Sequence, residues 1–437
     1  MVAATRPVLD ADTEAAGLCA YVDASPSPFH ACAEAGARLE AAGFAPVDEG
    51  DAWPREPGRY FTLRGGSLVA WTTEHADGPA TGFRVVGAHT DSPNLRIKPH
   101  PSVARAGWQL LGVEVYGGPL LNSWLDRDLG LSGRVVVRGS HGTSERLLLI
   151  AEPILRVAQL AVHLDRDVNE SGVRLNPQQH LAPIWGVGTE PGDVTAMIGE
   201  AVQCEPSDVL GWDLMTHDLT PSRRIGRSRE LIAAPRLDNL ATCYAGVRAM
   251  VTAAESSAGG PRIPLLVLFD HEENGSTSER GASSTLLPAA LERIVIGLGG
   301  GREDYLRAMA STVVASGDMG HATHPNYVER HEPQHEIAVN AGPVLKINSR
   351  LRYATDARGA AAFVLACEQA DVPVQTFVSR SDMPCGSTVG PITAALTGAT
   401  TVDFGAAMLS MHSARELCGA ADPAMYVAAL TAFLSPP

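Results

Sequence analysis

The 437-residue sequence lacks a long apolar run, because no stretch of about 18 or more consecutive apolar residues occurs in it. The first 25 residues also lack the basic segment followed by an apolar block that marks a secretory signal. We therefore expect neither a membrane-spanning helix nor secretion, and the sequence predicts a cytoplasmic protein.

Cysteine and positive charge are also in short supply. The seven cysteines are odd in number and never occur in the CxxC spacing, which argues against a disulfide framework and a thiolate zinc site. Lys and Arg number 34 against 49 Asp and Glu, so the formal net charge is −15. Nucleic acid and anionic membranes are not expected as partners, since phosphate binding needs basic patches. We interpret the one basic cluster, RRIGRSR at 223–229, as a solvated loop or an interface element.

What the sequence does contain is 45% hydrophobic residues, enough core for two domains or for one large domain with an insertion. Strand-like and helix-like segments alternate in residues 1–98 and again in residues 235–437. This alternation predicts one α/β domain with a mainly parallel sheet covered by helices. Residues 99–234 carry strand-like pieces separated by Gly-rich turns and few convincing helices, which predicts a β-rich insertion.

Individual elements can be placed along the α/β part. Ser27 and Pro28 form a helix start, and Gly43 marks the end of a helix of about 15 residues. Further helices are expected at 238–255, 283–297, 356–370, 388–397 and from about 422. Strands are expected at 263–269, 312–316, 344–348, 372–378 and 400–405.

Polar residues follow several of these strands. Because ligands bind at the carboxyl ends of the strands in a parallel sheet, we expect the polar residues to converge. Imidazole and carboxylate are the usual zinc ligands where Cys is absent. The segments are GAHTD (His89, Asp91), RLDN (Asp238), FDHEE (Glu272, Glu273), SGDMGH (Asp318, His321) and SMHS (His412).

The candidate ligands are too many for one catalytic zinc ion, which takes three protein ligands and keeps an open position. They suit two metal ions that share a carboxylate. Each segment alone has an ordinary alternative, since an Asp after a strand is more often a helix N-cap. Asp91 in HTD could accept the second ring N–H of His89 and so fix its tautomer.

The stretch PLLVLFDHEENGSTS at 264–278 places two carboxylates at the end of an apolar run. If the chain stays extended to residue 273, Glu272 and Glu273 point to opposite sides. One could then bind metal while the other faces the substrate and transfers protons. The alternative is a pair of solvated acids in a loop.

Eight segments between about residues 21 and 418, together with YVDASPSPFH near the start, resemble the aspartyl aminopeptidase family of di-zinc metallopeptidases. In order, they are GAHTDSPNLRIKP, LAVHLDR, RLDNL, FDHEENGS, SGDMGHATHPN, KINSRLRYATD, MPCGSTVGPI and MLSMHSARE.

The resemblance implies two divalent metal ions per subunit, zinc in the first place and Mn²⁺ or Co²⁺ as alternatives. Asp238 matches the carboxylate that bridges both ions. His89 and Asp318 complete one site, and Glu273 and His412 complete the other.

It also implies the reaction, which is release of N-terminal Asp and Glu from peptides through a metal-bridging water. Glu272 matches the general acid/base, and Asp91 the residue that orients His89. His321, Lys346 and Tyr353 match substrate-binding residues.

For assembly, the resemblance implies that residues 99–234 are a dimerisation domain and that homodimers assemble into a dodecamer. His163 matches a histidine that is delivered into a neighbouring subunit's active site, where it binds substrate.

The substrate preference leaves alternatives open. An acidic N-terminal side chain needs a local cation, and Lys346 with the Tyr353 hydroxyl could supply the charge and a donor. Arg350 and Arg352 are rivals for this role. Asn274 and Met383 depart from the family pattern, which affects pocket shape more than reaction type. A di-metal aminopeptidase of neutral preference, an amide deacylase and a non-catalytic shell are the competing hypotheses.

Overall fold

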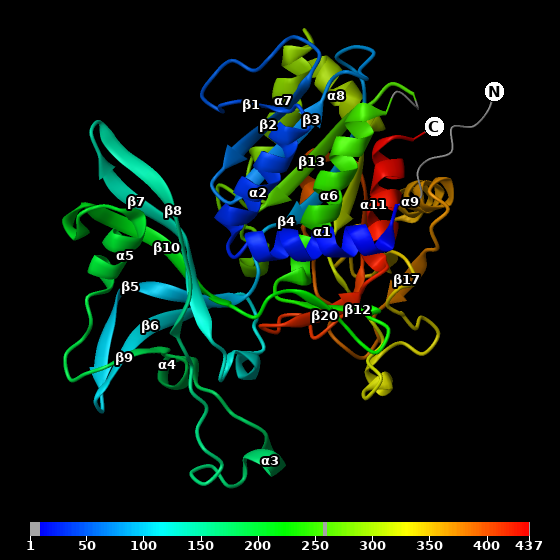
Figure 1. Cartoon of the computed structure of the whole chain (residues 1–437). Helices are drawn as coiled ribbons and strands as arrows, with labels where there is room; N and C mark the ends of the chain where they lie inside the picture. The colour runs from blue at the N-terminus through cyan, green and yellow to red at the C-terminus, as the bar shows by residue number, and fades with distance from the viewer. Residues whose placement is uncertain (1–8, 257–259, 437) are drawn as a thin grey trace.

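The protein is described from a computed structural model that covers residues 9–256 and 260–436. Figure 1 shows two parts joined side by side: a sheet covered by helices, and a β-rich unit that projects from it. The N-terminal and C-terminal segments both belong to the helix-covered part, and the β-rich unit lies between them in the sequence. This arrangement confirms the predicted α/β class with an inserted β-rich region.

The large sheet has the strand order β1-β2-β3-β13-β4-β14-β18-β16-β17. Its central pairs β13–β4, β4–β14 and β14–β18 are parallel, while β16 runs antiparallel to β18 and β3 to β13. The sheet is therefore mixed at its edges and parallel where the polar strand ends were predicted. The strands are β1 Ala45–Pro46, β2 Arg59–Arg64, β3 Ser67–Thr72, β4 Phe83–His89, β13 Ile263–Phe269, β14 Val313–Gly317, β16 Val344–Ile347, β17 Gln375–Val378 and β18 Thr400–Gly405.

Helices cover both faces of this sheet because its strands present apolar side chains on both sides. Leu68 and Ala70 of β3 pack into one core with α1, α2, α6, α9 and α11, whereas Val69 and Trp71 pack into the other with α7, α8 and α10. These helices are α1 Ala11–Ala24, α2 Pro28–Ala41, α6 Leu237–Glu255, α7 Leu286–Gly297, α8 Arg302–Ser311, α9 Ala357–Gln369, α10 Val389–Thr397 and α11 Asp422–Leu434.

The predicted helices match the observed ones closely, and the start at Ser27 is confirmed. The Ser27 side chain caps α2 by accepting from the His30 amide, and Gly43 follows the helix with a positive φ of 83°. The sequence prediction did not place α1 or α8. No helix in the described part of the chain combines the length and apolar character that a membrane span requires.

The β-rich unit is built on a six-stranded sheet of order β8-β7-β10-β5-β6-β9, in which all neighbouring strands run antiparallel. It has a core of its own around Leu95, Leu131 and Leu148. Its strands are β5 Asn94–Arg105, β6 Trp108–Tyr116, β7 Leu129–Gly139, β8 Gly142–Leu155, β9 Ile184–Val187 and β10 Val209–Asp218. Its helices are α3 Val168–Ser171, α4 Pro177–His180 and α5 Val194–Val202, with 3₁₀ turns η1 Leu121–Trp124 and η2 Pro206–Asp208.

The α/β part contains a third sheet, with the strand order β11-β12-β20-β19-β15. It lies near the ends of the central strands where the polar residues were predicted, since its strand β15 follows Asp318 closely. Strand β12 pairs with β20, so residues 223–234 join the α/β part rather than the six-stranded sheet. The sequence did not predict this sheet, because its short strands come from distant segments. They are β11 Arg223–Ile225, β12 Leu231–Ala234, β15 Gly320–His321, β19 Ala407–Leu409 and β20 Glu416–Gly419.

Candidate metal centre

The predicted ligands come together where the central strands end. His89 is the last residue of β4 and lies beside Phe269, the last residue of β13, in the parallel register. Asp318 follows β14 directly, and Asp238 stands at the start of α6, after β12. His412 comes from the turn between β19 and β20. The convergence of these segments agrees with the rule that parallel sheets bind ligands at their carboxyl ends.

The two carboxylate oxygens of Asp238 face two different histidines. Its Oδ1 lies 3.4 Å from His89 Nε2, and its Oδ2 lies 3.5 Å from His412 Nε2. Asp318 Oδ1 lies 3.6 Å from His89 Nε2, and Glu273 Oε2 lies 3.3 Å from His412 Nε2. The ligand atoms therefore form two triads that share Asp238, each compact enough to hold one metal ion.

Both histidines turn the same ring nitrogen toward the cluster. His89 Nδ1 lies 3.0 Å from the Asp91 carbonyl oxygen, and His412 Nδ1 lies 2.9 Å from the Gly118 carbonyl oxygen. A carbonyl oxygen only accepts, so Nδ1 carries a hydrogen, and Nε2 is the nitrogen that could offer a lone pair to a metal ion. This tautomer suits metal binding through Nε2.

Glu416 is a buried carboxylate that the sequence analysis missed. It accepts hydrogen bonds from the Asp238 amide at 3.0 Å and from the His412 amide at 2.7 Å. Ser92 Oγ adds a donor to the Asp238 carbonyl at 2.7 Å. Glu416 thus holds one ligand of each triad through the backbone. A signal was present, because an acid stands four residues after His412 in MHSARE.

Asp91 contacts both His89 and the glutamate pair. The Asp91 carboxylate is completely buried and lies 3.5 Å from His89 Nδ1. The backbone carbonyl oxygen of Asp91 lies closer to the same nitrogen, at 3.0 Å. Its Oδ1 accepts from the Glu272 amide and its Oδ2 from the Glu273 amide, both at 3.1 Å. Asp91 therefore also fixes the backbone of both glutamates.

The predicted extended conformation through residue 273 is wrong. Strand β13 ends at Phe269, His271 takes a left-handed conformation with φ 64°, and Glu272–Asn274 form a 3₁₀ turn, η3. Both glutamate side chains line the same pocket instead of pointing to opposite sides. The turn is favoured because the Glu272 and Glu273 amides find acceptors in the Asp91 carboxylate, which local sequence patterns do not reveal.

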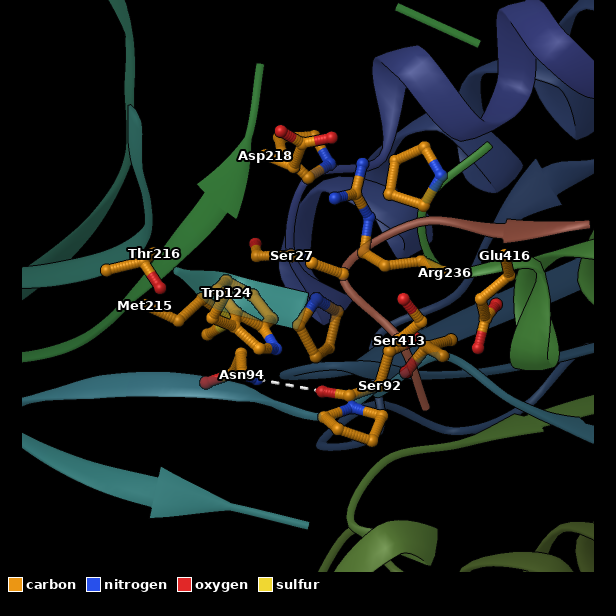
Figure 2. Close-up of a pocket in the computed structure, with 16 residues that line it drawn as sticks. Ser27, Ser92, Asn94, Trp124, Met215, Thr216, Asp218, Arg236, Ser413 and Glu416 are labelled. Carbon is orange, nitrogen blue, oxygen red and sulfur yellow. Dashed lines mark hydrogen bonds between the residues drawn. The ribbon is translucent and has the colours of Figure 1, made fainter. Parts of the chain in front are cut away.

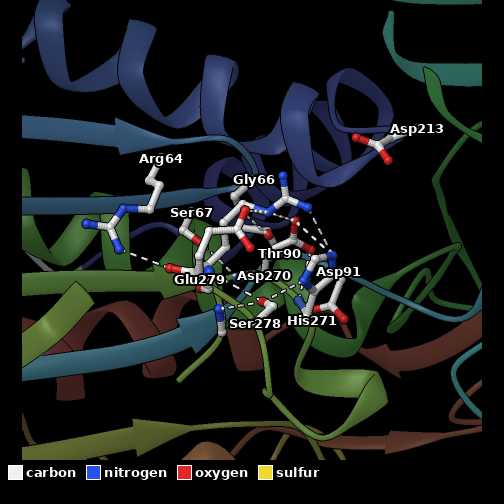
Figure 3. Close-up of polar contacts among 12 residues, drawn as sticks. Arg64, Gly66, Ser67, Thr90, Asp91, Asp213, Asp270, His271, Ser278 and Glu279 are labelled. Carbon is white, nitrogen blue, oxygen red and sulfur yellow. Dashed lines mark hydrogen bonds and ion pairs between the residues drawn. The ribbon is translucent and has the colours of Figure 1, made fainter. Parts of the chain in front are cut away.

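Asp270 and His271 hold this turn from outside, and Figure 3 shows their contacts. The Asp270 carboxylate accepts from the His271 amide at 2.9 Å and lies 3.4 Å from Arg280 Nε. The His271 ring lies 2.7 Å from Ser278 Oγ through Nδ1 and 3.2 Å from the Arg280 guanidinium through Nε2. The Asp and His that precede the glutamate pair are therefore structural.

The charges of the cluster are unbalanced without a cation. Burial and the charge of Asp238 raise the pKa of Glu273 well above its usual value. Burial lowers the pKa of His412, but its hydrogen bond to Asp238 and the Glu273 charge outweigh burial and raise that pKa to about 10. Burial, with nearby Asp318, raises the pKa of Glu272 to about 8.

Two oxygen atoms in the cluster are buried with no hydrogen-bond partner among the described residues: Asp238 Oδ1 and Glu273 Oε1. Buried polar atoms of this kind normally have a partner. Nitrogen and oxygen donors without sulfur suit Zn²⁺, and Mn²⁺ or Co²⁺ share such ligands. The donor set and its orphaned oxygens therefore fit divalent metal ions.

A pocket of about 380 Å³ opens beside the two triads. His321, Lys346 and Tyr353 line it, together with the apolar Leu120 and Phe377. Arg350 and Arg352, the rival cations, are exposed and lie outside this lining. His163 also lies outside it, in an exposed loop of the β-rich unit.

Lys346 is buried and already engaged. Its ammonium donates to the Met319 carbonyl at 2.7 Å, lies 3.6 Å from Asp318 Oδ2, and sits 5.4 Å from the centre of the Tyr353 ring. An ammonium has three donors, so the Met319 hydrogen bond leaves donor capacity for a second acceptor.

A second, smaller cavity lies between the β-rich unit and the α/β part, and Figure 2 shows its lining. Trp124 and Asn94 come from one side, Arg236 and Glu416 from the other. Its volume of about 20 Å³ has room for about one water molecule.

Comparison with known proteins agrees with this geometry. Residues 21–434 match the family described as "Aminopeptidase I zinc metalloprotease (M18)". "Probable M18 family aminopeptidase 2" of Mycobacterium tuberculosis is 56% identical over 423 residues, which cover 96% of this chain and 97% of that protein.

Solved structures give the same result. The "Cryo-EM structure of the Ape4 and Nbr1 complex" contains a chain that is 34% identical with a TM-score of 0.93, covering 97% of this chain and 86% of that one. The "Structure of S. cerevesiae mApe1 dodecamer" is 25% identical with a TM-score of 0.82, covering 97% and 96% of the two chains.

Proposed function

The chain belongs to the M18 family of zinc aminopeptidases and is a metal-dependent aminopeptidase, and from this premise we propose that it removes N-terminal Asp, and to a lesser degree Glu, from peptides. We further propose that each subunit uses two divalent metal ions, held by the two triads that share Asp238. The observation that carries the proposal is a buried cation, Lys346, in the wall of the pocket that the triads line.

Metal ions bound in the triads would polarise the scissile carbonyl and lower the pKa of a coordinated water towards about 7. The protein's own residues do the rest. Glu272 takes the proton of the attacking water and passes it to the leaving amine, and its side chain lines the pocket beside both triads. Asp91 holds the Glu272 amide and so keeps this carboxyl group in place.

Recognition of the substrate's acidic side chain is assigned to Lys346 and Tyr353, with His321 as a further pocket residue. A charge-assisted hydrogen bond from Lys346 would be strong because the ammonium is only 2% exposed. One observation favours the alternative, a neutral preference or an amide deacylase. Lys346 already donates to the Met319 carbonyl, and Leu120 and Phe377 give the pocket an apolar wall.

The first experiment compares matched chromogenic amides of N-terminal Asp, Glu, Leu and Ala. It is done with the purified enzyme before chelation, after chelation, and after zinc or manganese is restored. We expect metal-dependent cleavage with Asp well ahead of Leu. Preference for Leu or Ala would keep the metal mechanism and discard the acidic pocket, and absence of cleavage with all four would favour the deacylase.

The same substrates test Lys346 directly. Replacing Lys346 by Met keeps most of the side-chain length and removes the charge. We expect kcat/KM for the Asp amide to fall by about 10- to 150-fold, since a hydrogen bond to a charged group contributes about 1.5–3 kcal/mol, while the Leu amide changes little. Arg350→Met is the matched control, because Arg350 is an exposed cation outside the pocket. An unchanged Asp-to-Leu ratio in Lys346→Met would place acidic selectivity elsewhere.

We also propose that homodimers assemble into a dodecamer and that His163 enters a neighbouring subunit's pocket to contact substrate. His163 lies among the exposed apolar residues Leu160, Val162 and Leu164, which are 57%, 49% and 75% exposed in the single chain. Such a group of apolar side chains favours burial against a partner. Light scattering at the monomer mass would overturn this assembly and remove His163 from the site.

A further inference from the structure

The β-rich unit contacts the metal centre through a short segment, Tyr116–Leu120, which links β6 to η1. The Tyr116 hydroxyl donates to Asp91 Oδ2 at 2.7 Å. Gly118 and Leu120 pair with His412: the Gly118 carbonyl faces His412 Nδ1 at 2.9 Å, and the Leu120 amide donates to the His412 carbonyl at 2.9 Å. This segment therefore contacts groups on both sides of the cluster.

Of these contacts, the hydrogen bond from Tyr116 to Asp91 affects the most residues of the site. The Asp91 carboxylate is completely buried and holds the amides of both glutamates. A carboxylate that accepts several hydrogen bonds has its rotation set by all of them together. Tyr116 is the one side-chain hydroxyl that donates to Asp91 among the described residues, so it decides with the amides how that carboxylate lies.

The Tyr116 ring is itself held firmly. It is 7% exposed, and the Arg96 guanidinium lies 3.8 Å from its centre. A cation this close to an aromatic face is attracted to it. Both residues belong to the antiparallel pair β5–β6, in which Arg96 and Tyr116 sit near the same end. The hydroxyl position is thus determined by the sheet of the β-rich unit.

Asn274 adds a second tie between the same segment and the glutamate turn. Its side-chain oxygen accepts from the Gly117 amide at 3.2 Å. A Cβ at Gly117 would come within 3.2 Å of the Glu273 Cβ, and Gly117 has a φ of 70°. A glycine suits this position because the backbone passes close to the turn. Asn274, an unusual residue after the glutamate pair, thus has a partner in the β-rich unit.

We propose that Tyr116 is a positioning residue for the metal centre: its hydroxyl fixes the Asp91 carboxylate that places Glu272, Glu273 and His89. The chemistry then depends on how the β-rich unit is seated against the α/β part. The proposal rests on the proposed roles of Glu272 and of the two triads, but it does not depend on the preference for Asp.

The test compares Tyr116→Phe with Tyr21→Phe in the full-length enzyme. Tyr21 is a second buried tyrosine, and its hydroxyl donates to the Ala31 carbonyl at 3.3 Å in the helical core. We expect Tyr116→Phe to lower kcat by about 10- to 100-fold with little change in KM, and to weaken zinc binding by a similar factor, as for other groups that orient metal ligands. Tyr21→Phe should change neither.

Zinc affinity is measured by competition with a chromogenic chelator, which needs no substrate. This readout decides the proposal even if the enzyme prefers neutral N-termini or cleaves none of the amides. Unchanged zinc affinity and unchanged kcat in Tyr116→Phe would overturn it. So would a mere loss of thermal stability that matches the Tyr21→Phe control.

A double-mutant cycle tests whether Tyr116 acts through Asp91. If it does, adding Tyr116→Phe to Asp91→Asn should cause no further loss of zinc affinity, since the orienting carboxylate is already gone. Additive losses would mean that Tyr116 acts by another route and would contradict the proposal.

Discussion

Replacing Glu272 by Gln is expected to lower kcat by about 10²- to 10⁴-fold, the range that general acid–base catalysis contributes. The amide keeps the shape of the side chain but can no longer accept the proton of the attacking water. Glu272 belongs to neither triad that shares Asp238, so metal content should stay at the wild-type value. Steady-state kinetics and metal analysis of the same preparation check both parts.

Glu279→Gln is the matched control, because Glu279 follows the same turn with its side chain 68% exposed. It should leave kcat within about twofold, as surface changes away from a site usually do. Retained activity in Glu272→Gln would refute its role as acid/base. Loss of metal would instead make Glu272 a ligand, since it also lies close to His89 and Glu273.

Replacing Asp238 by Asn should remove both metal ions and activity with them. Asp238 contributes one oxygen to each triad, and a neutral amide cannot bridge two cations in the same way. We expect less than one metal ion per subunit and activity below about 1% of wild type, because loss of zinc removes its Lewis-acid chemistry. Metal analysis after gel filtration measures the number of metal ions per subunit.

Thermal unfolding separates this effect from simple damage to the fold. Metal ions that bind only the native state stabilise it by mass action, so zinc should raise the Tm of the wild type and not that of Asp238→Asn. Asp422→Asn is the control, because Asp422 is another buried carboxylate, at the start of α11, that accepts from the Asn340 amide. It should keep its response to zinc. A zinc-dependent rise in Tm for Asp238→Asn would show that the bridging role is wrong.

For the glutamate pair, the sequence predicted the position in the fold but not the local conformation. The apolar run 263–269 is a completely buried strand, and an acid at its end was expected near a metal. The conformation after Phe269 was predicted wrongly, because the turn depends on His271 at φ 64° and on acceptors from Asp91, 181 residues away from Glu272 in the chain. The periodicity of a short stretch of sequence cannot predict hydrogen-bond acceptors that are so distant in the chain.

Lys346 shows a second limit. Its position on a strand was predicted, and the pocket does include it. Its contacts with the Met319 carbonyl and the Asp318 carboxylate could not be predicted, since they depend on how β14 and β16 sit on either side of β18. Those contacts decide how freely Lys346 can meet a substrate.

By itself, the sequence determined the alternating α/β plan, the β-rich insertion and the residue types at the strand ends, because each of these follows from spacing along a short stretch. His89, Asp318 and the glutamate pair were predicted in this way. The third sheet, the hydrogen bond of Glu416 to the Asp238 amide, and the hydrogen bond of the Tyr116 hydroxyl to Asp91 were decided only by the tertiary structure. The physical reason is that these contacts join segments that are distant in the sequence or that lie where the β-rich unit meets the α/β part. At such places the burial of side chains and the need to satisfy hydrogen bonds select the partner.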